Sequence, residues 1–154
     1  MKSIALFDNR LQTVVPDDFI DMPIETLQVM FPNEKRPQVI KGSPDGSYAT
    51  FSLLERELSR QQLFTASHGA LSLLEKFYPS CYNQRVHIIP LEEGTCGWFS
   101  FLVQGKKNIL FIIAIDGKML IGSCGGSEND YKRMDELKML FLSVKTTPKC
   151  EETS

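Results

Sequence analysis

The sequence lacks most of the residue patterns that identify a chemical function directly. Its four cysteines form no Cys-x-x-Cys pair, so neither a disulfide framework nor a cysteine-based zinc site is indicated. The two histidines, His68 and His87, lie near no cysteine in the sequence. Gly122–Ser127 has neither the lysine of a P-loop nor the glycine spacing of a dinucleotide-binding motif. We therefore expect no bound metal and no cofactor.

An excess of positive charge and long apolar runs are also missing. Seventeen Lys and Arg residues face nineteen Asp and Glu residues, a net charge of -2, which is not the basic excess of a general nucleic-acid binder. The longest apolar run, Ile109–Ile115, is far shorter than the roughly 18 residues that suggest a membrane span. Near the start, Ile4–Phe7 is shorter than the roughly 7–15 apolar residues of a secretory signal. We expect a cytoplasmic protein that binds neither nucleic acid nor membrane.

The length and composition are those of one ordinary globular domain. With 154 residues, 42% of them hydrophobic, the chain can bury a core without a disulfide or a metal. It shows no internal repeat and no linker. We predict a single domain over residues 1–147 and a polar C-terminal tail over residues 148–154.

Two hairpins are predicted in the N-terminal part. Asp8–Arg10 separates the first pair of β-type runs, and Pro44-Asp45-Gly46 supplies the turn chemistry between the second pair. We expect an irregular segment anchored by Phe19 between the two hairpins. The predicted elements are strands at Ile4–Phe7 and Leu11–Val15, the irregular segment Phe19–Pro23, a short helix at Ile24–Phe31, and strands at Gln38–Lys41 and Tyr48–Leu54.

A long helix follows. Ser59 and Gln62 have the spacing of a capping box, and Pro79 ends the helical pattern. Gly69, inside the helix, is interpreted as a point of close packing on a sheet. The apolar residues that share one helical face are Leu63, Ala66, Ala70, Leu71, Leu74 and Phe77.

The C-terminal half predicts a meander of strands and a last helix. Asp116-Gly117 between two apolar runs is a strong hairpin signal, because a type I′ turn needs positive φ at both central residues. Ile109–Ile115 is apolar without alternation, which is typical of a strand that is covered on both faces. The predicted elements are strands at Val86–Pro90, Gly97–Val103, Asn108–Ile115 and Lys118–Ser123, followed by a helix capped by Ser127 and extending to Val144.

Residues with possible reactivity each have a plain structural interpretation. A thiolate at Cys124 would be stabilised by the dipole of the helix that follows. We favour the interpretation that Cys124 is a small apolar residue at the end of a strand. Whether Cys96 or Cys124 is reactive stays open. His68 follows Ser67 on the helix, where neighbouring positions do not face each other, so no catalytic dyad is indicated. Trp98 lies opposite Phe99 on its strand and is either a core residue or an exposed binding hot spot. No catalytic residue is assigned.

The order of elements and two local motifs resemble the PsbP-like superfamily, over about residues 3 to 145. Thr13-Val14-Val15-Pro16 followed by Phe19-Ile20-Asp21 is similar to the opening of its Mog-type branch of Ran-binding import factors. Lys118–Ile121 and the helix after it are similar to the closing strand and helix of the family. The resemblance implies an α+β fold, an α-β-α sandwich around a central antiparallel sheet, and binding or assembly roles rather than catalysis.

The resemblance also implies where a partner binds. In the Mog-type branch, acidic residues after the opening hairpin contact Ran, and Asp21 matches that region. Residues 32–37 replace the acidic cluster that follows in the branch, so Ran itself is not the expected partner. The predicted partner-binding residues are Asp17, Asp18, Asp21, Glu25 and Trp98.

Two functional hypotheses remain open. The first is a non-catalytic adaptor or chaperone-like module that binds another protein. The second is a small-ligand carrier or an enzyme, with a pocket between the sheet and the long helix near His87, Cys96 and Trp98. A deep pocket with converging polar groups would favour the second hypothesis.

Overall fold

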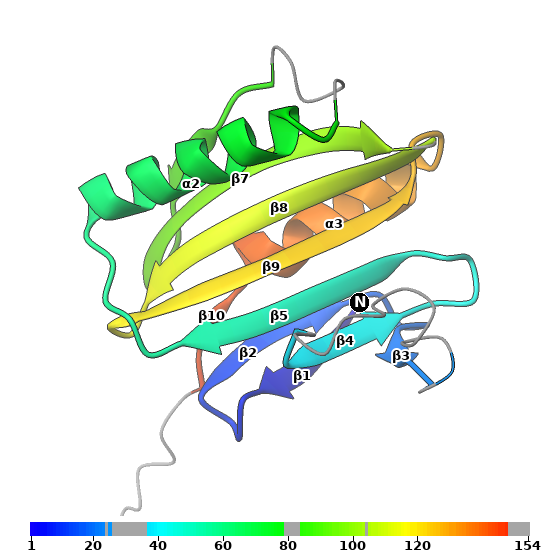
Figure 1. Cartoon of the computed structure of the whole chain (residues 1–154). Coiled ribbons are helices and arrows are strands. Elements are labelled where there is room, and N and C mark those ends of the chain that lie inside the picture. Colours follow the sequence, from blue (N-terminus) through cyan, green and yellow to red (C-terminus); the bar gives the residue numbers. More distant parts are fainter. Residues whose placement is uncertain (24, 26–36, 79–83, 104, 148–154) are drawn as a thin grey trace, which may run out of the picture.

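A computed structural model describes residues 1–23, 25, 37–78, 84–103 and 105–147 of the chain (Figure 1). The predicted helix at residues 24–31, apart from Glu25, and the predicted tail at 148–154 lie outside the described residues. The described strands are β1 (Lys2–Leu6), β2 (Leu11–Val15), β3 (Ile20–Asp21), β4 (Val39–Gly42), β5 (Tyr48–Leu54), β6 (His87–Pro90), β7 (Gly94–Val103), β8 (Lys106–Ile115), β9 (Lys118–Ser127) and β10 (Lys145–Thr146), and the helices are α2 (Arg60–Glu75) and α3 (Tyr131–Leu142).

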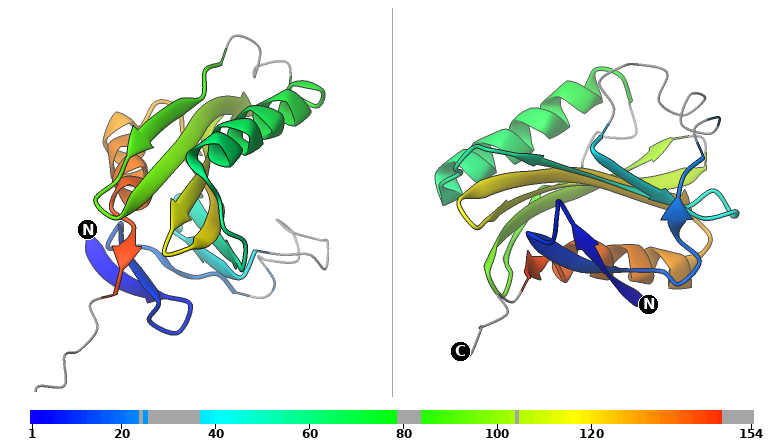
Figure 2. Two further views of the ribbon diagram at one scale, coloured as in Figure 1. Left: turned by 90° about the vertical axis from the view of Figure 1, so that its left-hand side faces the viewer. Right: turned by 90° about the horizontal axis from the view of Figure 1, so that it is seen from below.

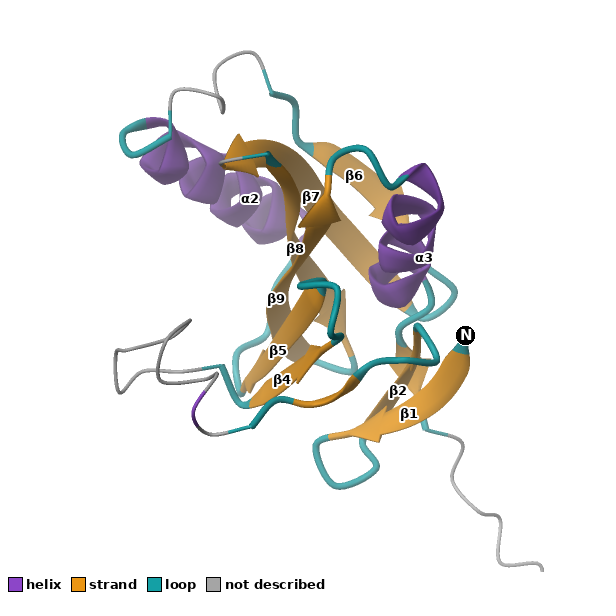
Figure 3. Cartoon of the chain, turned by 90° about the vertical axis from the view of Figure 1, so that its right-hand side faces the viewer, coloured by secondary structure: helices purple, strands orange, loops and turns teal. Residues whose placement is uncertain are grey.

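The strands form two antiparallel sheets. The large sheet has the order β3-β4-β5-β9-β8-β7-β6, and the small sheet has the order β1-β2-β10. Helix α2 packs on β7 and β8, whereas α3 packs on the opposite face, against β9 and against β2 of the small sheet (Figures 2 and 3). The protein therefore has the predicted α+β fold, with the closing meander as one antiparallel sheet and a helix on each face.

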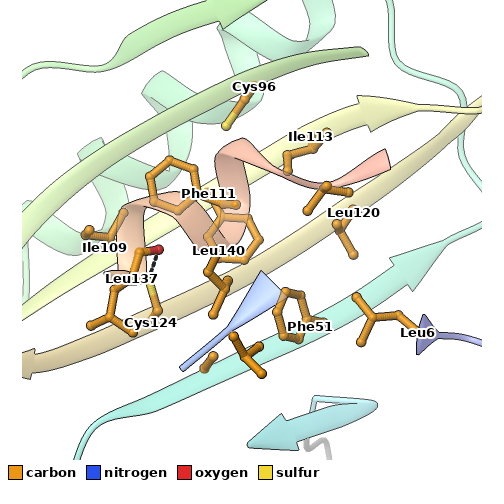
Figure 4. Close-up of a cluster of buried hydrophobic side chains, with 14 of the residues drawn as sticks. Leu6, Phe51, Cys96, Ile109, Phe111, Ile113, Leu120, Cys124, Leu137 and Leu140 are labelled. Carbon is orange, nitrogen blue, oxygen red and sulfur yellow. Dashed lines mark hydrogen bonds between the residues drawn. The ribbon is translucent and has the colours of Figure 1, made fainter. Parts of the chain in front are cut away.

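Most of the hydrophobic core lies on the α3 side of the large sheet. The Phe111 ring is its centre, with ring centroids 5.9 Å from Phe51 and 5.3 Å from Phe141. Cys124 also lies here and donates its S–H to the Leu137 carbonyl oxygen, 3.8 Å away (Figure 4). This core extends from the small sheet to α3 and is continuous. On the α2 side the buried residues form two smaller clusters, around Leu63 and around Phe99.

Several local predictions are confirmed. Asp116 and Gly117 have φ of 53° and 68°, as a type I′ turn requires. Ser59 and Gln62 form the capping box at the start of α2. Cys124 is a buried strand residue, as expected, although its strand does not end there but continues to Ser127. The turn and the capping box depend on neighbouring residues only, and so the sequence reveals them.

Other local predictions are wrong at their boundaries. Residues 20 and 21 form β3 rather than an irregular segment, because β4 offers them a free edge. The predicted strand ends at Ser123, but β9 continues to Ser127, which pairs with Lys106, so residues 124–127 are also part of the sheet. Asp130, not Ser127, caps α3, and its carboxylate accepts the Arg133 N–H at 3.0 Å.

Two predictions for the long helix are also wrong. Gly69 faces solvent, with no atom within 4 Å of the position that a Cβ would occupy, so it marks no close packing. Phe77 follows the end of α2 and is 69% exposed, so it does not belong to the buried stripe. The close approach between helix and sheet occurs instead at Ser67, whose Oγ lies over Gly97 of β7.

Candidate functional site

Three of the predicted binding residues lie together after the opening hairpin, and each carboxylate already has a partner. Asp17 is 3.1 Å from the N-terminal ammonium, and Asp21 is 2.6 Å from Lys41 Nζ. Asp18 accepts a hydrogen bond of 2.6 Å from Arg133. Glu25 is exposed. The structure therefore brings Asp17, Asp18 and Asp21 into one region, in which they take part in ion pairs within the protein.

Trp98 lies apart from these carboxylates, on β7. Its ring is half-buried on the α3 side, stacked on His87 at 4.4 Å and near Phe141 at 5.6 Å. Lys138 Nζ lies 5.8 Å from the ring centroid. Cys96, two residues earlier on the strand, points to the same face. A pocket between the sheet and α2 cannot contain Cys96 and Trp98, because strand alternation directs both of them away from α2.

The described residues enclose a cleft at the β3 edge of the large sheet. It has a volume of about 460 Å³, within the range of small binding pockets. Three segments supply its walls: the chain after β2, the β4–β5 turn and the start of β8. The described lining residues are Ile20, Met22, Pro23, Gly42, Ser43, Pro44, Gly46 and Lys106.

Strand pairing determines which face of the sheet the cleft occupies. Ile20 pairs with Gly42, and Gly42 pairs with Tyr48, so all three lie on one face. Phe51, in the α3-side core, belongs to the opposite face of β5 because it is an odd number of residues from Tyr48. The cleft is therefore on the α2 side of the sheet, although α2 itself lies over β7 and β8 (Figure 3).

The shape of the cleft follows from local sequence. In the Pro44-Asp45-Gly46 turn, Gly46 has φ of 91°, which residues with a side chain rarely adopt. The Asp45 carboxylate accepts the Ser47 N–H at 2.8 Å and fixes the turn. A Cβ on Gly42 would overlap the end of the Met22 side chain, so glycine at this position lets Met22 lie against β4.

Arg133 on α3 ties two cleft-forming segments together. Its guanidinium is 2.6 Å from Asp18 and 3.1 Å from Asp45, and it lies 5.4 Å from the centroid of the Phe19 ring. Asp18 also accepts a hydrogen bond of 2.7 Å from the Ser43 hydroxyl. We call Arg133, Asp18, Asp45 and Ser43 the Arg133 clamp. Because it joins the residues before β3 to the β4–β5 turn, the clamp links two of the three segments that form the walls of the cleft.

The clamp shifts the pKa of both carboxyl groups downward. For Asp18, hydrogen bonds first from Arg133 and then from Ser43 lower the pKa. For Asp45, burial raises the pKa, but hydrogen bonds from Ser47 and Ser43 and the charge of Arg133 outweigh it, so the pKa falls to about 2. Both groups are therefore ionised at neutral pH and the clamp is formed.

A polar network lies beside the cleft on the same face. The Tyr48 hydroxyl donates a hydrogen bond of 2.6 Å to Asn108 Oδ1, and Asn108 Nδ2 donates one of 3.2 Å to the Lys106 carbonyl. A Cβ on Gly125 would lie 2.8 Å from Tyr48 Cε1. Because Gly125 has no side chain, the Tyr48 ring can lie over this position of β9. Burial raises the pKa of Tyr48 to about 12, which keeps its hydroxyl protonated.

The thiols and histidines of the described residues form no reactive arrangement. Burial raises the pKa of Cys96 to about 12 and also raises the pKa of Cys124, so both thiols are protonated at neutral pH and weak as nucleophiles. His68 Nδ1 bonds the Phe64 carbonyl on its own helix, whereas the neighbouring Ser67 points toward the sheet. Within the described ranges no three His, Cys, Asp or Glu side chains are grouped as metal ligands.

Sequence reasoning missed most of the cleft. The sequence predicts Ile20 in an irregular segment and assigns no role to Lys106. The sequence offered one signal, the residues Pro23, Gly42 and Pro44 near apolar side chains. These positions are separated in the chain, and only the pairing of β3 with β4 brings them together.

Comparisons with known proteins identify related folds but no family. No family model and no curated protein matches the sequence. A crystal structure of a protein from Bacteroides thetaiotaomicron superposes with a TM-score of 0.60 at 10% identity, covering 96% of this chain and 49% of the other. LpqN of Mycobacterium tuberculosis, described as involved in cell envelope biogenesis, superposes with a TM-score of 0.55 at 14% identity, covering 96% of this chain and 90% of the other.

These identities show a shared fold and nothing about activity. The chain spans about half the length of the Bacteroides protein. No helix among the described residues has the length and apolar character needed to cross a bilayer.

Proposed function

We propose that this chain is a non-catalytic binding module, an adaptor or chaperone-like protein, that holds another protein at the cleft between β3, the β4–β5 turn and Lys106. The observation that carries the proposal is the apolar cleft, with Ile20 58% exposed at its wall. An exposed β-branched side chain beside a formed cleft suits a partner side chain that packs against it.

The Arg133 clamp supports the proposal because it links two cleft-forming segments. Ion pairs of 2.6 Å and 3.1 Å join these segments before a partner arrives. Binding then costs less ordering of loops, so more of the contact free energy appears as affinity. In this proposal Asp18 and Asp21 contribute to binding indirectly. Their ion pairs with Arg133 and Lys41 position the segments that form the cleft walls.

We further propose that the chain has the PsbP-like, Mog-type sandwich. The order of elements supports this assignment: an opening hairpin, a second hairpin, a long helix, an antiparallel meander and a closing helix. The two helices on opposite faces of the large sheet agree with it. We place the protein in the cytoplasm, a proposal supported by the free, buried thiols of Cys96 and Cys124.

A photo-crosslinker at the cleft tests the proposal. With benzoylphenylalanine at the exposed position 44, irradiation of cells that express the protein from its own promoter should give adducts with a defined protein. The same adducts should disappear with Ile20→Asp, because a carboxylate in the apolar wall is costly to bury. The matched control is Tyr131→Asp, which places a carboxylate at a 78% exposed aromatic residue on α3.

The proposal is wrong if the adducts survive Ile20→Asp or if position 44 gives none. Both variants should unfold within about 0.5 kcal/mol of the wild type, since both positions are exposed. Matching urea midpoints therefore separate loss of binding from loss of folding.

A small-ligand carrier is the second candidate, because about 460 Å³ is enough for a small molecule. Native mass spectrometry of the protein purified from its own cells distinguishes the two candidates. A carrier would retain a defined added mass that Ile20→Asp removes and Tyr131→Asp preserves.

A further inference from the structure

Among the described residues, the cleft combines apolar walls with one cation. Lys106 is exposed and supplies the one charged side chain among the described lining residues. Its Nζ lies 3.5 Å from the position that a Cβ on residue 46 would take, so the ammonium lies over the β4–β5 turn. Within the described part of the chain, no carboxylate forms an ion pair with Lys106.

Two acidic residues on the segments around the cleft are paired with other cations. Asp21 is 2.6 Å from Lys41, and Asp45 is 3.1 Å from Arg133. Neither of them forms an ion pair with Lys106. The main chain of Lys106 is meanwhile held in place, because its carbonyl accepts a hydrogen bond from Asn108. The Lys106 ammonium therefore lies at the cleft on a hydrogen-bonded backbone, and none of the described residues supplies a counter-ion.

Building on the proposed function, we propose that the cleft binds a segment of the partner protein in which an Asp or Glu lies next to a bulky apolar residue. The apolar side chain fills the space beside Ile20 and Met22, and the carboxylate pairs with Lys106. The edge position of β3 gives an extended segment access to the cleft from the side of the sheet. Charge complementarity thus selects an acidic segment over a neutral or basic one.

The size of the preference follows from the exposure of Lys106. An ion pair at an exposed site changes binding by a modest factor, so we expect an acidic residue to improve affinity about threefold to fivefold over its amide counterpart. The apolar residue should contribute more, because removing it leaves the cleft empty.

Selection from a random displayed peptide library tests the proposal without knowledge of the partner. The wild type should enrich peptides with Asp or Glu beside Leu, Ile, Met or Phe. With Lys106→Glu the apolar preference should remain while Lys or Arg replaces the acidic residue. The matched control is Lys132→Glu, an exposed lysine on α3, which should enrich the same peptides as the wild type. Urea midpoints of both variants confirm that they are folded.

The outcomes separate this proposal from the proposed function. If the wild type selects apolar peptides without a preference for charge, and Ile20→Asp abolishes this selection, the proposal on Lys106 is wrong. The proposed function as a binding module then still stands. A library that yields no peptide sensitive to Ile20→Asp overturns both. The cleft could instead bind a small anionic amphiphile, and an NMR titration with decanoate tests this alternative. Saturable chemical-shift changes at cleft amides, together with a library that yields no peptide, would overturn the peptide proposal.

Discussion

The two faces of the large sheet are built differently. On the α3 side, one continuous core joins β5, β7, β8 and β9 to α3 and to the small sheet. On the α2 side, the buried residues form two smaller clusters under the helix, and the far end of the same face carries a polar network and the cleft. The α3 side thus holds most of the buried core, whereas the other face carries the cleft at which we propose binding. Substitutions on the two faces should therefore affect different measurements.

The largest difference should appear in core truncations. Phe111→Ala on the α3 side removes a fully buried ring that contacts Phe51 and Phe141, and should cost about 3–5 kcal/mol of unfolding free energy. Leu63→Ala under α2 should cost about 2–3 kcal/mol, because a helix at the edge of the core can settle into part of the space. Urea unfolding measures both values. An equal or larger loss for Leu63→Ala would contradict the comparison.

Glycine substitutions give a smaller effect with opposite signs. On the α3 side of β9, a Cβ at Gly122 would overlap the Thr50 carbonyl oxygen and lie 2.5 Å from Phe111 Cζ, so Gly122→Ala should destabilise by roughly 1–3 kcal/mol. Gly69 on α2 has open space and a helical backbone, so Gly69→Ala should stabilise by up to about 1 kcal/mol. Thermal unfolding of the pair shows the sign directly. Destabilisation by Gly69→Ala would mean that α2 packs more closely than described.

The smallest effect concerns the Arg133 clamp, which links the two faces. Because the folded-state pKa values of Asp18 and Asp45 lie below their values in the unfolded chain, near 3.9, their stabilisation is complete above that pH. It is lost as the pH falls from about 4 toward 2. Both carboxylates are more than a third exposed, so solvent screening limits the contribution to about 1 kcal/mol.

Arg133→Met should remove part of this pH dependence. The variant should lose stability at pH 7 and less of it between pH 4 and pH 2, while the hydrogen bonds from Ser47 to Asp45 remain. Urea midpoints across pH 2–7 measure the slope, and Lys138→Met, which removes a cation near Trp98, is the matched control. An unchanged slope for Arg133→Met would show that the clamp does not hold the cleft walls.

Much of the fold could be predicted because its signals are local. Ser59 with Gln62, and Asp116 with Gly117, depend on neighbours within four residues, and both were predicted correctly. The alternation of Trp98 and Phe99 on β7 correctly assigned them to opposite faces.

The cleft could not be predicted, because its parts meet only in the folded chain. Arg133 and Asp18 are 115 residues apart, and no periodicity of either segment indicates that they form an ion pair. The strand β3 is two residues long and exists because β4 has a free edge, which makes it too short for an alternation pattern. The same holds for β10, whose residues the sequence assigns to no strand.

The small sheet has a consequence for the order in which the protein folds during synthesis. Residues 145 and 146 pair with Gln12 and Leu11, and the carboxylate of Glu93 accepts hydrogen bonds from Thr146. The opening hairpin therefore leaves the ribosome before β10 does, and its sheet is complete only once this last described strand follows. During that interval β2 has an unpaired edge, which a chaperone or a neighbouring nascent chain can reach.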